Sequence, residues 1–85
     1  MDEIGDQMVA GGTYVFRRGD PAAWVHIVRT GSIELSRIIN GPRVMLQLLH
    51  PGDVFGDVPA LLGRSEPFDA RAIEDSSLSM NQAQR

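Results

Sequence analysis

Glycines divide the middle of this 85-residue chain into short segments, and this regular division limits what the chain can fold into. They stand at positions 19, 31, 41, 52 and 63, ten to twelve residues apart. The segments between them hold strand-forming residues, and none shows a βαβ pattern or a long amphipathic helix. This spacing is typical of an all-β roll, barrel or sandwich.

Short apolar or alternating runs give the expected strands. Asn40-Gly41 is a strong hairpin signal, and Pro42 makes the hairpin loop longer than two residues. Residues 1–9 are expected to be a frayed end. Asn81 could cap a helix that starts at 82. The expected strands cover residues 13–16, 24–30, 33–39, 44–49, 54–55, 68–73 and 77–80.

Composition excludes several classes of function. The chain has no cysteine, which removes disulfides, thiolate catalysis and cysteine-bound metal clusters. Its net charge is −3 and its eight basic residues are scattered arginines. The chain is therefore expected to bind nucleic acid poorly on its own. No apolar run approaches the roughly 20 residues that span a bilayer, and no signal pattern opens the chain. We therefore expect a cytoplasmic protein that does not bind a membrane.

One stretch, residues 51–64, combines a turn, a short strand, a glycine–acid step and an apolar helical turn. Val54 and Phe55 favour a strand, and Gly56 allows a backbone conformation closed to other residues. Asp57 and Val58 open the helical turn, whose first amides lack internal partners and point outward. The stretch therefore predicts a cradle for a ligand.

These residues resemble the phosphate-binding cassette of the cyclic nucleotide-binding domain, and more narrowly the sensor half of the catabolite activator/fumarate-nitrate regulator (CRP/FNR) superfamily. The best-matching pieces are Phe16–Asp20, His26–Gly31, Pro51–Asp57 and Ala72–Ser76. The resemblance implies a mainly β fold, a double-stranded, jelly-roll-like β-roll with one short helical turn in the cassette.

The resemblance also predicts how the chain is organised. We expect an N-terminal tail at 1–10, the roll at 11–80 and the start of a truncated helix at 81–85. In the family, a long helix that dimerises the protein and a helix-turn-helix DNA-binding domain follow the roll. Neither is in these residues, so contact with DNA would use a domain absent from the chain. A homo-oligomer is expected.

The resemblance implies a site at Gly56, Asp57 and Val58 for a small-molecule effector, possible ligands being cyclic AMP and cyclic GMP. Asp57 takes the place of the family's acid, a longer glutamate, that holds the ribose hydroxyl. An alternative role for Asp57 is an N-cap that bonds the amide of Ala60.

The chain departs from the family pattern at the arginine that pairs with the cyclic phosphate. Counting back from Ala72 places Glu66 or Pro67 at that position. Arg64 lies two residues earlier, and Arg71 lies on the following strand. Both arginines are candidate effector ligands. The cassette is therefore interpreted as degenerate, with cyclic-nucleotide binding weakened.

Three functions stay open at this point. The first is the sensor domain of a CRP/FNR-type transcription regulator. The second is a ligand-free structural or dimerisation module on the same fold. The third, a cupin-type metalloenzyme, would need His26 and His50 to share a metal ion. No catalytic motif is present, so the chain is not expected to be an enzyme.

Overall fold

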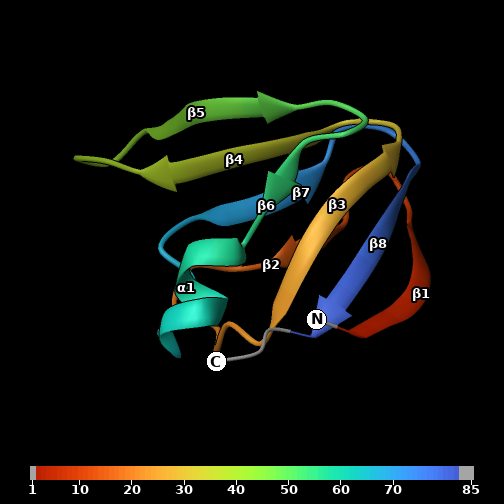
Figure 1. Cartoon of the computed structure of the whole chain (residues 1–85). Helices are drawn as coiled ribbons and strands as arrows, with labels where there is room; N and C mark the ends of the chain where they lie inside the picture. The colour runs from red at the N-terminus through yellow and green to blue at the C-terminus, as the bar shows by residue number, and fades with distance from the viewer. Residues whose placement is uncertain (1, 83–85) are drawn as a thin grey trace.

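The computed structural model describes residues 2–82 and shows a mainly β protein with one short helix (Figure 1). Every strand pairing among these residues is antiparallel. In chain order the elements are β1 (Asp2–Val9), β2 (Tyr14–Phe16), β3 (Trp24–Thr30), β4 (Ile33–Ile38), β5 (Arg43–Leu49), β6 (Val54–Phe55), α1 (Asp57–Leu62), β7 (Asp69–Ala72) and β8 (Ser76–Gln82).

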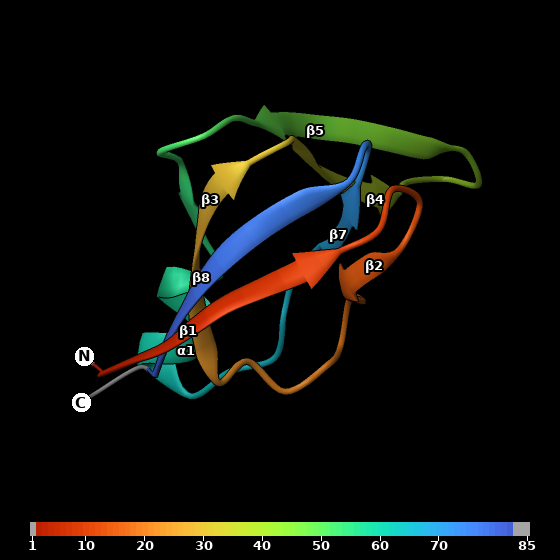
Figure 2. The ribbon, with the colours of Figure 1, turned by 90° about the vertical axis from the view of Figure 1, so that its right-hand side faces the viewer.

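The strands form two four-stranded sheets that face each other (Figure 2). One sheet has the order β1-β8-β3-β6 and the other has the order β2-β7-β4-β5. Neighbours in each sheet are mostly distant in sequence, as in a jelly roll, and the sheets do not close into a barrel. The predicted β-roll with one helical turn is confirmed.

The hydrophobic core lies between the two sheets and draws on both. Val28 and Leu78 come from one sheet, and Ile33, Leu49 and Ala70 come from the other. All five are at most 1% exposed, so their burial supplies the main favourable term in folding. Alternation along each strand explains the pattern, because every second side chain points toward the facing sheet.

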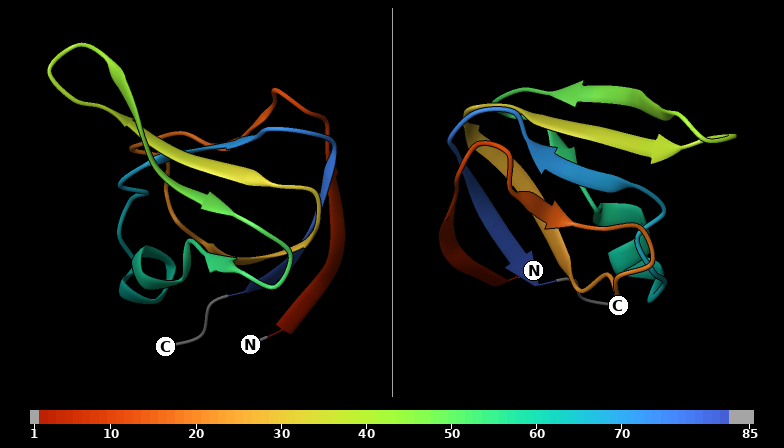
Figure 3. Two further views of the ribbon diagram at one scale, coloured as in Figure 1. Left: turned by 90° about the horizontal axis from the view of Figure 1, so that it is seen from above. Right: turned by 180° about the vertical axis from the view of Figure 1, so that it is seen from behind.

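The β4–β5 hairpin extends beyond the rest of the roll (Figure 3). Its loop covers residues 39–42, with Asn40 at a φ of 53° and a hydrogen bond from the amide of Ile39 to the carbonyl of Pro42. The expected loop of more than two residues is confirmed. Strand β5 of this hairpin exposes four large apolar side chains, those of Val44, Met45, Leu46 and Leu48.

Two expectations about the chain ends are wrong. The segment Asp2–Val9 is strand β1 rather than a frayed end, and it pairs with β8 along its length. Asn81 and Gln82 do not begin a helix, since they pair with both β1 and β3. The physical reason is shared: β8 needs backbone partners on both edges, and β1 supplies one of them. The rest of the predicted helix, 83–85, lies outside the described residues.

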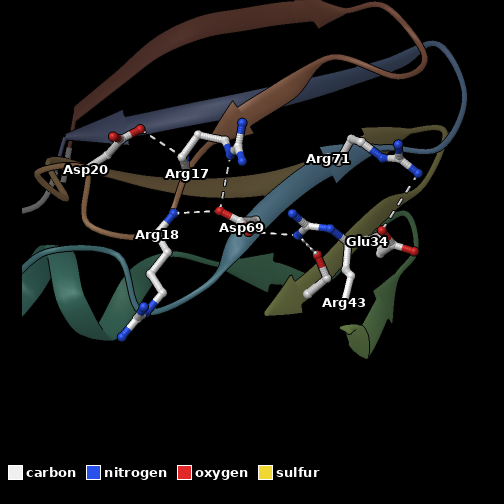
Figure 4. Close-up of polar contacts among 8 residues, drawn as sticks. Arg17, Arg18, Asp20, Glu34, Arg43, Asp69 and Arg71 are labelled. Carbon is white, nitrogen blue, oxygen red and sulfur yellow. Dashed lines mark hydrogen bonds and ion pairs between the residues drawn. The ribbon is translucent and has the colours of Figure 1, made fainter. Parts of the chain in front are cut away.

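A buried carboxylate ties three strands together at one end of the roll (Figure 4). Asp69 of β7 accepts hydrogen bonds from the amide of Arg18 at 2.8 Å, Nη1 of Arg43 at 2.8 Å and Nε of Arg17 at 3.3 Å. These donors come from the segment after β2 and from the start of β5. The contacts fix the loop at 17–20, which borders the site described below.

Gly31 tests the close packing of the turn between β3 and β4 against the start of β8. Its φ is +85°, and a Cβ there would lie 2.7 Å from the carbonyl oxygen of Asp75 and against the side chain of Ser76. We expect Gly31→Ala to lower the free energy of unfolding by about 3 kcal/mol, from backbone strain plus overpacking. Urea unfolding followed by the fluorescence of Trp24 measures the change.

Gly12→Ala is the matched control. Its φ is +87°, yet a Cβ there would meet no atom within 4 Å. It should cost only the backbone strain, about 1 kcal/mol. Equal losses for the two variants would show that close packing at Gly31 contributes nothing.

Candidate functional site

The cassette is a strand that turns through a left-handed glycine into a helix. Strand β6 ends at Phe55, and Gly56 follows with a φ of +74° as the residue that precedes α1. A Cβ at Gly56 would lie 3.2 Å from Cδ2 of His26 and 3.3 Å from the carbonyl oxygen of Trp24. The position therefore requires glycine for both conformation and space.

Asp57 is the first residue of α1 and not its cap. The helix has no side-chain cap hydrogen bond, and the amide of Ala60 donates to the carbonyl of Gly56 instead, at 3.3 Å. The alternative expectation that Asp57 bonds the amide of Ala60 is therefore wrong. An acid in the first turn still interacts favourably with the free amides of the helix start.

Gly56, Asp57 and Val58 line a cavity of about 350 Å³ at the cassette, here called the cassette cavity. Apolar groups make up most of its wall, including the rings of Phe16, Phe55 and Phe68. The size and the mixture of apolar walls with a few polar groups are typical of a small-molecule site. The remaining lining residues are Leu35, Gln47, Val54, Pro59, Glu66 and Pro67.

Glu66 is the most unusual residue of the cassette cavity. It is 3% exposed, its Oε1 has no hydrogen-bond partner, and its Oε2 lies 3.6 Å from where a Cβ on Gly56 would be. Burial, with a smaller contribution from Asp20, raises the pKa of Glu66 to about 7. The cavity wall thus holds a carboxyl group at a position where the resemblance implies an arginine.

The histidine in contact with Gly56 supplies no positive charge. His26 is buried, and its ring stacks on Phe55 with 4.9 Å between ring centroids. Burial lowers the pKa of His26 to about 4, so the imidazole is neutral at physiological pH. No arginine lines the cassette cavity among residues 2–82, while Asp57 and Glu66 are both acids. The described lining therefore brings acidic groups and no guanidinium group to the cavity.

Neither candidate arginine reaches the cassette cavity. Arg64 follows Gly63, which ends α1, and it lines a neighbouring cleft. Arg71 alternates with the core residues Ala70 and Ala72 on β7, so its side chain lies on the opposite face of the sheet. There its Nη2 is 3.9 Å from Oε1 of Glu34 (Figure 4).

The structure adds residues that local patterns did not indicate. Phe16 comes from β2 and Gln47 from β5, far from the cassette in sequence, and long-range pairing alone brings them to the cavity.

Over the described part of the chain, no cluster of three or more histidine or acidic residues could hold a metal ion. Within residues 2–82, no helix has the length and apolar character to cross a membrane.

Comparisons with known proteins agree with the mainly β fold described above. Residues 7–84 match the cyclic nucleotide-binding domain family. The chain is 40% identical over 68 residues to the HTH-type transcriptional regulator Cmr of Mycobacterium tuberculosis, a match that covers 80% of this chain and 28% of that protein. The chain thus spans less than a third of that relative.

Two solved structures are similar in fold and in sequence. The catabolite activator protein of Thermus thermophilus has a TM-score of 0.86 at 28% identity, over 91% of this chain and 37% of that one. FixK2 of Bradyrhizobium japonicum has a TM-score of 0.85 at 25% identity, over 96% and 40%. The chain belongs to the cyclic nucleotide-binding domain family, and within it to the type found in CRP/FNR regulators.

The raised pKa of Glu66 makes stability depend on pH. The folded state holds its proton up to about pH 7, whereas the unfolded chain releases it near the ordinary value of 4.5. Stability is therefore expected to fall as pH rises from 4.5 to 7. Glu66→Gln should remove that loss and be more stable than the wild type at pH 8 by about 1–2 kcal/mol, after a discount for solvent in the cavity.

Urea unfolding at pH 4.5 and pH 8 measures this difference. Glu74→Gln is the control, because Glu74 is exposed. The side-chain oxygen of the introduced glutamine could still accept the hydrogen bond that Glu74 accepts from the hydroxyl of Ser32. An equal effect of both substitutions, or a Glu66→Gln variant less stable at pH 8, would contradict an ionised, unpaired carboxylate at this position.

Proposed function

We propose that this chain is the effector-binding domain of a cytoplasmic CRP/FNR-type transcription regulator whose effector is not a cyclic nucleotide. The observation that carries the proposal is the cassette cavity, which keeps the family's glycine and helical turn. Its wall, as far as residues 2–82 form it, has carboxylates and no guanidinium group. Binding would shift the cassette between two arrangements. DNA would be contacted through another domain, in a homo-oligomer.

The missing cation has a measurable consequence. Loss of one partner from a buried charge pair costs about 2–5 kcal/mol, and about 1.4 kcal/mol is a tenfold change in affinity. An ionised Glu66 would add repulsion against a phosphate. Pro59 and Pro67, both in the cavity wall, have no amide hydrogen to donate. A micromolar site for a cyclic phosphate would thus weaken toward the sub-millimolar range or worse.

Calorimetric titration of the chain with cyclic AMP and cyclic GMP tests the proposal. We expect no binding tighter than about 100 μM for the wild type. Glu66→Arg should gain affinity for cyclic AMP by about tenfold or more, because a cation replaces the carboxylate beside Gly56. Asp6→Arg is the control, since it changes the net charge equally at an exposed position on β1.

Wild-type binding tighter than about 10 μM would overturn the proposal that the cassette has lost cyclic nucleotides. An equal gain in Asp6→Arg would assign the effect to net charge.

A structural module on the same fold is the second candidate. The apolar side chains on β5, together with Val58, Leu61 and Leu62 around α1, offer a surface for protein contact. Native mass spectrometry of the purified chain separates the two candidates. A small molecule retained by the wild type and lost in Gln47→Trp, which narrows the cavity from its β5 wall, supports the sensor. A dimer that never carries a ligand supports the structural module.

A further inference from the structure

The described arginines divide into two groups by their partners. Four of them, Arg17, Arg29, Arg43 and Arg71, form ion pairs with carboxylates. For the other three, Arg18, Arg37 and Arg64, no ion pair is found over residues 2–82. All three of these line a single cleft of about 360 Å³. The unpaired positive charge of the described chain is thus concentrated in one place.

The three arginines come from separate parts of the chain. Arg18 lies after β2, Arg37 on β4 and Arg64 directly after the end of α1. We call the space between them the three-arginine cleft; Gly19, Ser65, Glu66 and Pro67 complete its lining. It is distinct from the cassette cavity, with which it shares only Glu66 and Pro67.

Backbone hydrogen bonds hold two of these segments together. The amide of Gly19 donates to the carbonyl of Glu66 at 2.8 Å, and the amide of Glu66 donates to the carbonyl of Asp20 at 2.8 Å. A further bond joins the amide of Ala22 to the carbonyl of Arg64 at 3.1 Å, beside the bridge between residues 21 and 65. The backbones that carry Arg18 and Arg64 are therefore fixed side by side.

Each arginine backbone also has an independent anchor. The amide of Arg18 donates to the buried carboxylate of Asp69 at 2.8 Å (Figure 4). The amide of Arg64 donates to the carbonyl of Pro59 at 2.9 Å. Arg37 pairs with Val44 within the β4–β5 ladder. The folded chain thus presents three guanidinium groups to one cleft from a rigid frame, which limits the entropy lost when a ligand binds.

Among the described residues, no carboxylate forms an ion pair with the arginines of this cleft. Glu66 is the one acid in its lining, but its carboxyl group is buried beside Gly56, and burial raises its pKa where a nearby guanidinium would lower it. Three like charges around one cleft repel each other, and that repulsion is relieved when an anion binds between them. The whole chain has a net charge of −3, so this local excess of positive charge favours the binding of an anion.

We propose that the three-arginine cleft is a binding site for a small phosphate-bearing anion. Guanidinium groups match phosphate oxygens through paired hydrogen bonds, and three of them suit a compact group with two or more negative charges. The hydroxyl of Ser65 offers one more donor. A nucleic acid strand is disfavoured, because Arg17 and Arg43 are already paired with Asp69 and leave no basic stripe.

Titration of the labelled chain with pyrophosphate and with inorganic phosphate at low ionic strength tests the site. The side-chain Nε–H signals of Arg18, Arg37 and Arg64 are expected to shift together, with pyrophosphate binding more tightly than phosphate. Each of Arg18→Gln, Arg37→Gln and Arg64→Gln should weaken pyrophosphate binding by about tenfold. Arg29→Gln, with the same change in net charge outside the cleft, should leave binding unchanged.

Two further measurements keep the outcome clear. Thermal unfolding without ligand should show no loss of stability in the three cleft variants, because only repulsion between guanidiniums is removed; a marked loss would assign the arginines a structural role and overturn the proposal. An acidic peptide that binds more tightly than pyrophosphate, with the same dependence on the three arginines, would overturn it in favour of protein docking.

An equal loss of pyrophosphate binding in Arg29→Gln would reduce the effect to net charge and also overturn the site. The result is separable from the function of the cassette cavity. Glu66→Arg and the cyclic nucleotide titrations report on the cavity, whereas the arginine-to-glutamine series reports on the cleft. Either site can fail its test while the other passes.

Discussion

The carboxylate of Asp69 is the contact on which the arrangement of both sites depends. Burial works to raise its pKa, but hydrogen bonds from the Arg18 amide, Arg43 and Arg17 outweigh that effect and lower it. The ionised group thereby holds the loop at 17–20 against β7. That loop is hydrogen-bonded to Glu66, so the same contact that closes one end of the roll also sets the wall between cavity and cleft.

That wall gives the two neighbouring spaces opposite electrostatic character. On one side, the cassette cavity holds carboxylates among aromatic rings, and no cation lines it in the part of the chain that the structure describes. On the other side, the cleft holds three unpaired guanidinium groups. Both proposals rest on this contrast: weak binding of a cyclic phosphate in the cavity, and binding of a phosphate-bearing anion in the cleft. The backbone of the fold is shared with known members of the family, so the contrast comes from the side chains at these positions.

Much of the fold could be predicted because its signals are local. Strand β3 and the loop after β4 follow from alternation and from the Asn40-Gly41 turn. The chain ends were mispredicted because their structure is not local. The segment Asp2–Val9 contains three acidic residues and a glycine, and it becomes a strand because β8 offers a backbone edge. The same pairing extends β8 through Gln82, where a cap residue suggested a helix.

The same distinction between local and long-range signals applies to the residues of the cavity and the cleft. Gly56, Asp57 and Val58 lie together at the cavity because they are consecutive. Arg71 does not line the cavity, and alternation indicates this, since its neighbours Ala70 and Ala72 mark the buried face of β7. The three-arginine cleft has no local signal at all. Hydrogen bonds between loops over forty residues apart bring Arg18 and Arg64 together, and the pairing of β4 in its sheet places Arg37. Only the folded chain shows which of the described arginines the carboxylates leave unpaired.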